Sequence, residues 1–512
     1  MESKNTSIEK AYDAVVVGAG ATGTLAAKLL VEGGLRILVL DAGSERSALR
    51  SRFRRFSHKA IRRVLGVKSA DAIFRRRQPI QSRCYAWSGD PDSFVDDFQC
   101  PYGVPSSRPF IWLRSRQLGG RMKVRGHGGQ YYRLSASDFY PVDGLSEPWP
   151  LQPGELDPWY ALVERWLGLC GTLDNLPWLP DGEVAHVLEP TSSESRLQRS
   201  IIERWPGARP ILGRSAPFPY LEDANNTDRL QIQTGAIVRR IEVAKSGRVQ
   251  GVEWFDQRAG RIKRVESPLV FLCASALEST RILLLSRSPD SPIGLGGSSG
   301  VLGHYLMDHI RVQAIGKGPA LIQDFRTKGA SCIYLPRFDA RELQKPEPRR
   351  GFGVQLSQGS SAGSHESYFS SVSFGEMLPR FENRVTLDPT LKDAWSIPSL
   401  QIDCAHDGAE LQRAQAQIEA LRDLAKVAGA EITEIDSDPW PPGSANHECG
   451  TARMGHRPSN SVLDPNNECW EARGLYLTDG ACMPSQGTQN PTLTLLALTA
   501  RACHRALNMV GC

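Results

Sequence analysis

The sequence predicts an α/β protein built around a Rossmann-like, dinucleotide-binding βαβ unit. Residues 13–17 predict a buried strand, since the four residues after Asp13 are all apolar, and a G-x-G-x-x-G motif follows directly. An Ala- and Leu-rich run over residues 21–31 predicts the helix, and residues 36–40, apolar after Arg36, predict a second strand that ends at Asp41. The motif alone is weak evidence, but its place after a strand, before a helix and upstream of an acid is specific for nucleotide binding.

Each glycine of the motif has a physical role. Gly18 permits a tight turn, Gly20 has no Cβ to hold the backbone away from a pyrophosphate, and Gly23 lets the helix pack closely on the strand. The helix N-terminus then presents free N–H groups to the phosphates. Asp41 is predicted to accept hydrogen bonds from ribose hydroxyls, and because a carboxylate there would repel a 2′-phosphate, NADP is not expected.

The length of 512 residues predicts two to four domains. The composition, with 40% hydrophobic residues, is that of an ordinary globular protein. No apolar run approaches the ~20 residues that a membrane-spanning helix needs, and the polar N-terminus lacks the apolar region of a secretory signal. The eleven cysteines are scattered and never form C-x-x-C. We therefore expect reduced thiols, no metal site and a cytoplasmic location.

A strongly basic segment follows the second strand, at residues 46–83. Such a segment could contact a membrane surface, a nucleic acid or an acidic partner. No interleaved aromatic residues or nucleic-acid motif accompany the charge, so we favour a solvated insertion joined to the nucleotide domain, with one or two helices over residues 49–65. We expect neither a nucleic acid partner nor a membrane span.

The remaining elements predict one nucleotide domain that other segments interrupt. Residues 229–243 and 249–254 alternate apolar and polar side chains as paired strands do, and residues 269–275 predict a buried strand before a helix over residues 276–286. A later amphipathic helix is predicted at residues 410–428. Its apolar stripe is expected to consist of Leu411, Ile418, Leu421 and Leu424.

The C-terminal part of the chain carries the most specific motifs: HECGTARMG at 447–455, LYLTDG at 475–480 and NPTLT at 490–494. With the glycine motif, they resemble the glucose–methanol–choline (GMC) family of flavoprotein oxidoreductases. In that family a His-x-x-Gly-Thr-x-x-Met-Gly motif precedes a strand that runs into Asp-Gly, and a His or Asn precedes the last helix. The resemblance extends through residues 118–121, 132–133, 138–139, 274–278 and 303–309.

The sequences of three segments are most similar to a bacterial branch of this family near the pyranose and glycoside 3-oxidases. These segments are residues 77–85, 375–395 and 479–501. The resemblance implies an FAD-binding Rossmann-like domain of GMC type with an interleaved α+β substrate domain built on an antiparallel sheet. The implied FAD-binding parts are residues 1–145, 223–300 and 446–512, and the implied substrate-domain parts are residues 146–222 and 301–445.

Two residues match the catalytic positions of the family. Oxidising an alcohol with a flavin requires a base for the hydroxyl proton while the carbon-bound hydrogen leaves as hydride to N5. His447 matches the general base, a role that suits histidine because its ordinary pKa is about 6.5. Asn490 matches the second position, where its amide would orient the substrate oxygen. His447 alone could equally be a packed core residue, but its pairing with Asn490 argues against that.

The resemblance also implies which residues contact FAD. Asp479 and Gly480 would meet the ribityl chain and pyrophosphate, although Asp479 taken alone could be an acid in an ordinary turn. Val238 would contact adenine through its backbone. The N–H groups that begin the last helix, after Asn490, would stabilise negative charge on the reduced flavin. The other expected contacts are Gly18, Gly20, Ala21, Thr22, Gly23, Asp41, Ala42, Arg114, Gly119, Gly120, Ala274, Pro491 and Thr492.

The sequence departs from the family at the position of covalent flavin attachment. Val124 stands where pyranose oxidases carry the attaching histidine, so we expect non-covalent FAD. His127 lies out of register and would serve the loop or the substrate entrance. Arg125 replaces an aromatic residue, and it would either meet an anionic substrate group or pair with a local carboxylate.

Two classes of function remain. The first is an FAD-dependent alcohol oxidoreductase that oxidises a secondary ring hydroxyl of a sugar or glycoside to a ketone, at C3 in preference to C2. Within this class, amino sugars and non-sugar alcohols are rival substrates, and the electron acceptor is oxygen, a quinone or a redox protein. The second is a Rossmann nucleotide-binding or electron-carrying protein without alcohol chemistry, which would need neither His447 nor Asn490.

Overall fold

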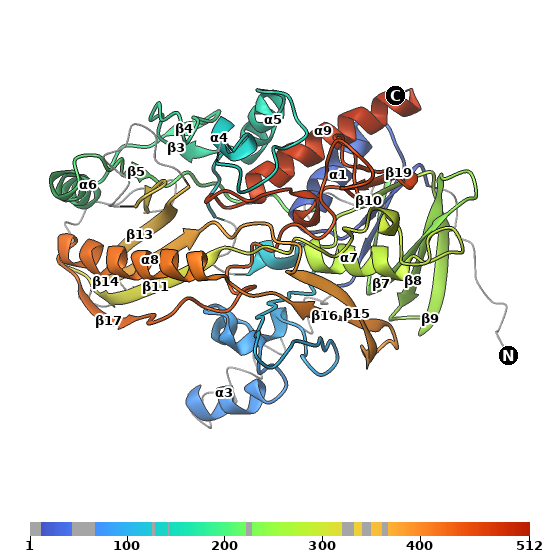
Figure 1. Cartoon of the computed structure of the whole chain (residues 1–512), viewed down its shortest axis with the longest axis horizontal. Helices are drawn as coiled ribbons and strands as arrows, with labels where there is room; N and C mark the ends of the chain where they lie inside the picture. Colours follow the sequence, from blue (N-terminus) through green and yellow to red (C-terminus); the bar gives the residue numbers. More distant parts are fainter. Residues whose placement is uncertain are drawn as a thin grey trace.

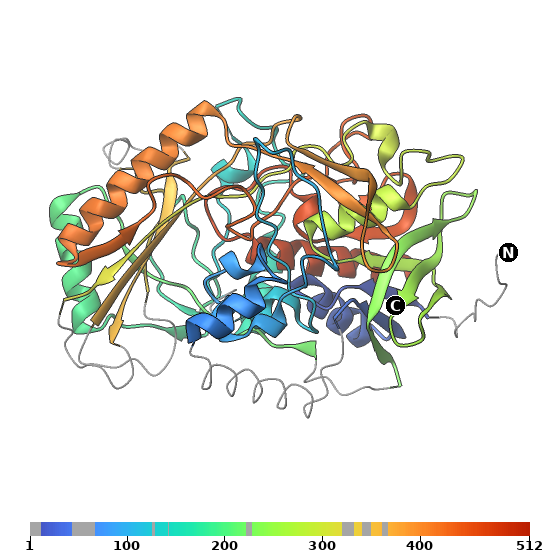
Figure 2. The same cartoon turned by 90° about the horizontal axis from the view of Figure 1, so that it is seen from below.

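Two large sheets organise the described part of the chain, one mainly parallel and one antiparallel, and they lie toward opposite ends of the long axis (Figure 1). A long helix, α8 (Gly408–Val427), covers one face of the antiparallel sheet (Figure 2). This arrangement confirms the predicted fold class. The computed structural model describes residues 12–43, 67–124, 129–141, 143–221, 228–319, 332–339, 350–360 and 367–511.

The parallel sheet has the strand order β18-β19-β10-β1-β2-β6, in which β18 runs antiparallel to β19. Its strands come from three separate parts of the chain, within residues 14–41, 230–272 and 468–477. Helices α1 and α9 pack against each other beside the sheet (Figure 1). These elements are β1 (Ala14–Val17), β2 (Ile37–Asp41), β6 (Leu230–Thr234), β10 (Leu269–Leu272), β18 (Glu468–Cys469), β19 (Ala472–Leu477), α1 (Ala21–Glu32) and α9 (Thr492–Val510).

Residues 229–243, predicted to pair with residues 249–254, form two strands in different sheets, and only the second of them makes that pairing. Gly235 divides the segment, because its positive φ of 67° turns the chain. The first half, β6, pairs in parallel with β2 and belongs to the nucleotide-binding sheet. The second half pairs with the next strand as predicted, in a separate antiparallel sheet of β7 (Ala236–Val243), β8 (Val249–Asp256) and β9 (Arg261–Glu266).

The antiparallel sheet has two chemically different faces. Alternate residues of β11, Ile310, Val312 and Ala314, pack in a hydrophobic cluster with α8, and the residues between them face the other way. The strand order is β17-β11-β14-β13-β12-β5. The elements are β5 (Ile211–Leu212), β11 (Ile310–Lys317), β12 (Ile333–Leu335), β13 (Phe352–Ser360), β14 (Ser367–Gly375), β17 (Glu431–Ile435), α6 (Ser192–Arg204) and α8 (Gly408–Val427).

Helix α8 is amphipathic as predicted, but Leu411 does not belong to its buried stripe. Leu411 is 49% exposed, whereas the neighbouring Glu410 is buried. Glu410 faces inward because its carboxylate accepts hydrogen bonds from the backbone N–H of Leu378 and from Arg380. The buried line therefore starts at Glu410 and continues through Ala414, Gln417, Ile418, Leu421, Leu424 and Ala425.

Smaller elements complete the described chain. The predicted helix over residues 49–65, with most of the basic segment, lies outside the described residues. No helix among the described residues is long and apolar enough to cross a membrane, and the ten cysteines described are free thiols. The other elements are α3 (Val67–Arg75), α4 (Ala136–Phe139), α5 (Asp157–Leu167), α7 (Ala276–Leu285), β3 (Cys170–Gly171), β4 (His186–Val187), β15 (Arg384–Lys392), β16 (Pro398–Asp403), and 3-10 turns at Gln81–Arg83, Trp87–Gly89, Pro91–Ser93, Gly120–Lys123, Gly297–Ser299 and Gly480–Cys482.

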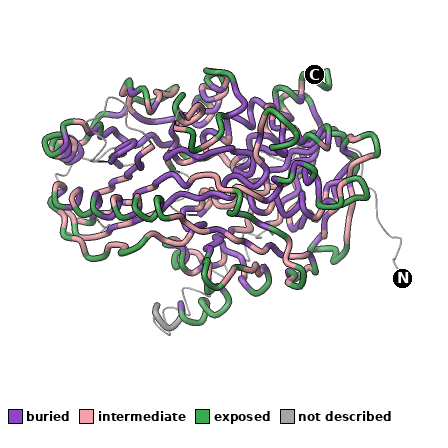
Figure 3. Tube along the Cα trace, in the orientation of Figure 1, coloured by how far each residue is buried: buried purple, intermediate pink, exposed green. Residues whose placement is uncertain are grey.

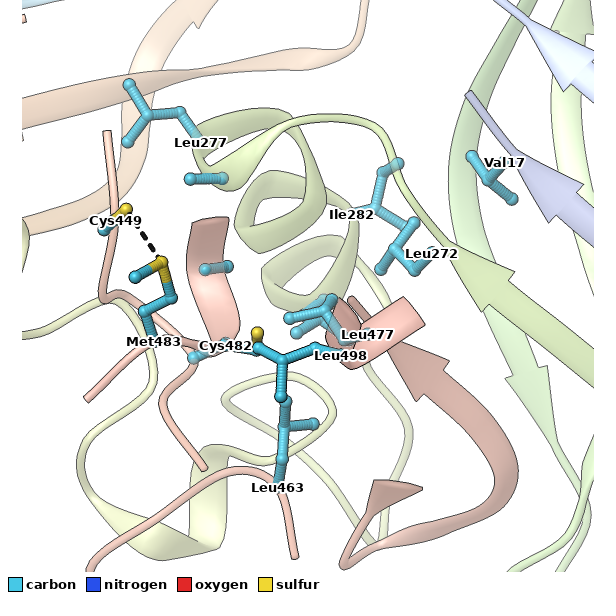
Figure 4. Packing of buried hydrophobic residues seen from close by; sticks show 14 of the residues in the cluster. Val17, Leu272, Leu277, Ile282, Cys449, Leu463, Leu477, Cys482, Met483 and Leu498 are labelled. Carbon is cyan, nitrogen blue, oxygen red and sulfur yellow. Dashed lines mark hydrogen bonds between the residues drawn. The ribbon is translucent and has the colours of Figure 1, made fainter. Parts of the chain in front are cut away.

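The segment that follows His447 is anchored in the largest hydrophobic core, part of the buried interior in Figure 3. Sγ of Cys449 lies 3.4 Å from Sδ of Met483, next to Leu277 of α7 (Figure 4). Gly450 has a φ of 97°, and a Cβ there would lie 1.9 Å from the carbonyl oxygen of Tyr305. This close approach explains the glycine of the His-x-x-Gly motif.

Candidate active site

A cavity of about 910 Å³ lies between the parallel sheet and the inner face of the antiparallel sheet. The glycine loop lines one part of it, and His447 and Asn490 line another. The inner face of the antiparallel sheet forms a further wall. The structure therefore brings the predicted nucleotide-binding and catalytic residues to one continuous space.

The lining contains most of the residues predicted to contact FAD. Gly23 is an exception, because it packs behind the loop, where a Cβ would lie 1.8 Å from the carbonyl oxygen of Gly18. Gly119 also does not line the cavity, and its N–H donates to the carbonyl oxygen of Ala19 at 3.1 Å. The lining includes Gly18, Gly20, Ala21, Thr22, Asp41, Ala42, Arg114, Gly120, Val238, Ala274, Asp479, Gly480, Asn490, Pro491 and Thr492.

Asp41 holds the glycine loop in place. Its carboxylate accepts hydrogen bonds from the backbone N–H groups of Ala19, at 2.8 Å, and Gly43, at 2.7 Å. Burial raises the pKa of Asp41, and these hydrogen bonds oppose that effect. A carboxylate has about four lone-pair positions, so these two bonds leave room for the predicted bonds from a ribose.

Two helix N-termini at this cavity suit an anionic cofactor. Helix α1 begins after Gly20 and α9 after Pro491, and neither helix has a side-chain cap or an acidic residue in its first turn. Their first N–H groups therefore lack the usual side-chain partners, and the helix dipoles favour negative charge there. At Gly20 nothing lies within 4 Å of a Cβ position. The residues present thus fit FAD, whose pyrophosphate would lie at the start of α1 and whose flavin would lie near the start of α9.

Charged residues near the predicted flavin end are paired with each other. Arg121 forms a two-point ion pair with Glu448, with N–O distances of 3.0 and 2.8 Å, and so ties the 3-10 turn at Gly120–Lys123 to the segment after His447. Asp479 caps the turn at Gly480–Cys482 by accepting from the N–H of Ala481 at 3.1 Å. Burial raises the pKa of Asp479 to about 6.

His447 lies between a second histidine and Asn490. Nδ1 of His447 is 2.8 Å from Nδ1 of His309, and Nε2 is 3.3 Å from Nδ2 of Asn490. Nε2 of His309 lies 3.0 Å from the carbonyl oxygen of Gly487. Gln355 is the last member of this series of hydrogen-bonded side chains, because its Nε2 donates to Oδ1 of Asn490 at 2.9 Å.

These contacts assign the position of each proton. The carbonyl of Gly487 can only accept, so Nε2 of His309 donates to it. Burial lowers the pKa of His309 to about 4, so its ring is neutral and its Nδ1 accepts. His447 must then carry its proton on Nδ1, which leaves the lone pair of Nε2 beside Asn490. His447 is therefore held in the tautomer that a general base requires.

The backbone of this segment is held by Asp308. The carboxylate of Asp308 accepts from the N–H groups of His447, Gly443 and Ala445, at 2.9, 2.7 and 3.0 Å. Burial and the nearby Glu448 raise the pKa of Asp308 to about 7, although the three donors favour its ionised form. Asp308 and His309 are adjacent, so one short segment fixes both the backbone and the ring of His447.

The inner face of the antiparallel sheet is largely polar. Strand alternation points Arg311 and Gln313 of β11 toward the cavity, opposite the residues that pack on α8. Gln355 of β13 is half-buried in the same wall and is the residue that donates to Asn490. The inward-facing residues on the three central strands are Arg311, Gln313, Gln355, Ser357, Ser370, Val372 and Phe374.

Sequence reasoning missed His309, Gln355 and Arg311. His309 ends the GHYLMDH motif, which pointed to the family but not to a contact with His447. The two polar wall residues lie in the long segment that carried no motif. Arg125 and His127 lie outside the described residues, so their predicted roles stay predictions.

Comparisons with known proteins add to this geometry. Residues 379–499 match the family model described as GMC oxidoreductase. The chain is 26% identical to 6'''-hydroxyparomomycin C oxidase of Streptomyces lividus over 96% of this chain and 91% of that protein. It is 26% identical to C-glycoside 3-oxidase of Arthrobacter globiformis over 59% of this chain and 56% of that protein. Its fold is similar to pyridoxine 4-oxidase from Mesorbium loti, with a TM-score of 0.62, 19% identity, and 96% and 98% of the two chains covered.

Proposed function

Because the chain belongs to the flavin-dependent GMC oxidoreductases, which act on CH–OH groups, we propose that it oxidises a secondary ring hydroxyl of a sugar or glycoside to a ketone. C3 is the favoured position, and C2 is the alternative. Bound FAD would accept the hydride from the carbinol carbon at N5. The residues proposed to hold FAD are the glycine loop, Asp41, Val238, Asp479 and the start of α9.

His447 and Asn490 carry the proposed chemistry of the protein. Nε2 of His447 would take the hydroxyl proton, and the contact with His309, which keeps the proton of the neutral ring on Nδ1, supports this role. The amide of Asn490, oriented by Gln355, would donate to the substrate oxygen. A nucleotide-binding protein without alcohol chemistry has no use for this pair, which argues against the second class of function.

The polar wall of the cavity is the observation that carries the sugar assignment. Amide, hydroxyl and guanidinium groups on β11, β13 and β14 line the same cavity as the His447–Asn490 pair, and Gln355 contacts Asn490 directly. A sugar ring presents hydroxyl groups that such a wall can bind, whereas an apolar alcohol would leave buried polar groups unsatisfied. The similarity to C-glycoside 3-oxidase supports oxidation at C3 of the sugar ring. Because of the similarity to 6'''-hydroxyparomomycin C oxidase, amino sugars stay the rival class of substrate.

Anaerobic flavin bleaching tests this proposal. We expect neutral pyranoses and glycosides to bleach the flavin, and the product of a favoured substrate to be its 3-keto derivative. Simple aliphatic and aromatic alcohols are the comparison set and should bleach it far more slowly. If those alcohols are the better reductants, the sugar assignment is wrong. The electron acceptor and the cytoplasmic location stay predictions.

We further propose that FAD is bound without a covalent bond. Val124 is 5% exposed and packs with Trp87 and Leu113 instead of lining the cavity. Acid precipitation is therefore expected to release the flavin absorbance into the supernatant. A yellow pellet would contradict this, and would direct attention to the lining cysteines or to His127.

A further inference from the structure

Arg311 is a charged residue in the wall of the cavity that the proposed chemistry does not use. It lies on β11, on the same inward face as Gln313, and its Nη2 donates to Oε1 of Gln313. Its guanidinium also stacks over Trp440, with Cζ 5.0 Å from the ring centroid. These two contacts orient the guanidinium and leave most of its five N–H donors for another partner.

No carboxylate among the described residues lies within ion-pair distance of Arg311. Asp436 has the largest electrostatic effect on it, but one oxygen of Asp436 already accepts from the N–H of Gln313 at 2.7 Å. Burial lowers the pKa of Arg311, which indicates that its charge is incompletely compensated. These contacts are typical of an arginine that binds an anionic ligand, and not of one that stabilises the fold through an ion pair.

The acidic residues described in the cavity lining are committed elsewhere. Glu278 pairs with Arg116 at 3.1 Å and Glu448 with Arg121 at 2.8 Å. The other two, Asp41 and Asp479, hold the glycine loop and the turn after β19. The described lining therefore offers a cationic substituent no available counter-charge, and it offers an anionic substituent Arg311.

Arg311 is also close to the catalytic pair. Its partner across β11 and β14 is Phe374, and directly opposite residues have Cβ atoms about 5 Å apart. The ring of Phe374 lies 5.2 Å from the ring of His447, centroid to centroid. A single sugar ring with one exocyclic group can therefore contact Arg311 and His447 together.

We propose that the substrate is an anionic sugar or glycoside, and that Arg311 binds its carboxylate, sulfate or phosphate group while a ring hydroxyl meets His447 and Asn490. This inference rests on the proposed sugar oxidation and names its substrate class. It also predicts that amino sugars are poorer substrates than anionic sugars, since an amino sugar would bring a positive charge next to Arg311.

The test measures the apparent second-order rate of anaerobic flavin bleaching with matched sugars. The set is methyl glucoside, methyl glucuronide, the 6-phosphate and 6-sulfate, and the 6-amino-6-deoxy glucoside. The wild-type holoenzyme should prefer at least one anionic sugar over the neutral glucoside by about 10- to 150-fold, the range for hydrogen bonds to charged groups. The amino sugar should be the poorest, and the best anion identifies the group that Arg311 binds.

Variants assign the preference to Arg311. In Arg311→Gln the ratio of anionic to neutral sugar should fall toward one, and Arg311→Lys should keep part of it, because lysine retains charge without a two-point contact. Arg83→Gln is the matched control, since Arg83 is an exposed arginine of the same lining. The inference is overturned if the wild type shows no anionic preference, or if Arg83→Gln lowers the ratio more than Arg311→Gln does. Failure of every sugar would instead refute the proposed function itself.

Discussion

Replacing His447 by alanine is expected to lower the anaerobic rate of flavin reduction by about 10²–10⁴-fold, the usual contribution of a positioned general base. Nε2 of His447 is the acceptor beside Asn490 in the cavity, and His309 fixes the proton on the other nitrogen. Without the imidazole, the proposed pair has no group that can take the hydroxyl proton, because the amide of Asn490 is not a base. Stopped-flow measurement across pH, with the variant saturated with FAD, should also show that the acidic limb of the profile has disappeared.

Asn490→Ala is the matched control for this variant. It removes the amide that lies 3.3 Å from His447 but keeps the base, so the rate should fall less and the acidic limb should remain. Asn490→His restores the pair of other family members and should retain measurable activity. If His447→Ala bleaches its flavin at the wild-type rate, the base lies elsewhere in the cavity.

The fold was largely predictable because its strongest signals are local. The βαβ unit followed from residue types within about 30 positions, and the structure confirms it with boundaries shifted by one residue. The errors arose where a tertiary contact overrode the pattern. Gly235 divides residues 229–243 into two strands, although the alternation of side chains continues across this glycine. Glu410 faces inward in place of Leu411 because its carboxylate accepts hydrogen bonds from Arg380 and from a backbone N–H.

The candidate site was predictable only where a motif carried it. His447 and Asn490 were predicted to act together, and the structure places them 3.3 Å apart. The wall residues were not predictable, because alternation in β11 shows that Arg311 and Ile310 face opposite sides without showing which side is the cavity. That choice depends on α8, which packs on Ile310 from about 100 residues later in the chain.

The position of His309 explains why β11 matters beyond substrate contact. Asp308 holds the backbone before His447, His309 contacts its ring, and Arg311 faces the cavity two residues later. The segment that runs from Asp308 into β11 would therefore align the proposed base with the group proposed to anchor the substrate. A shift of this segment would disturb both together, so variants of His309 and Arg311 are expected to be non-additive for anionic sugars.

His309→Leu is expected to lower the rate of flavin reduction by about 10–10²-fold, the usual effect of losing a group that orients a catalytic residue. The neutral ring of His309 accepts the Nδ1 proton of His447, and its pKa of about 4 keeps it neutral across the assay range. Accepting that proton also favours the charged form of His447. Loss of the acceptor should therefore move the acidic limb of the pH–rate profile to lower pH.

Two further variants separate positioning from packing. His309→Asn keeps an acceptor oxygen and should recover part of the rate and move the limb back toward the wild-type pH. His406→Leu removes another histidine whose pKa burial also lowers, but which does not line the cavity, so the limb should stay in place. If His309→Leu slows the reaction while its acidic limb coincides with that of the wild type, His309 only fills space. The tautomer of His447 must then be set by another contact.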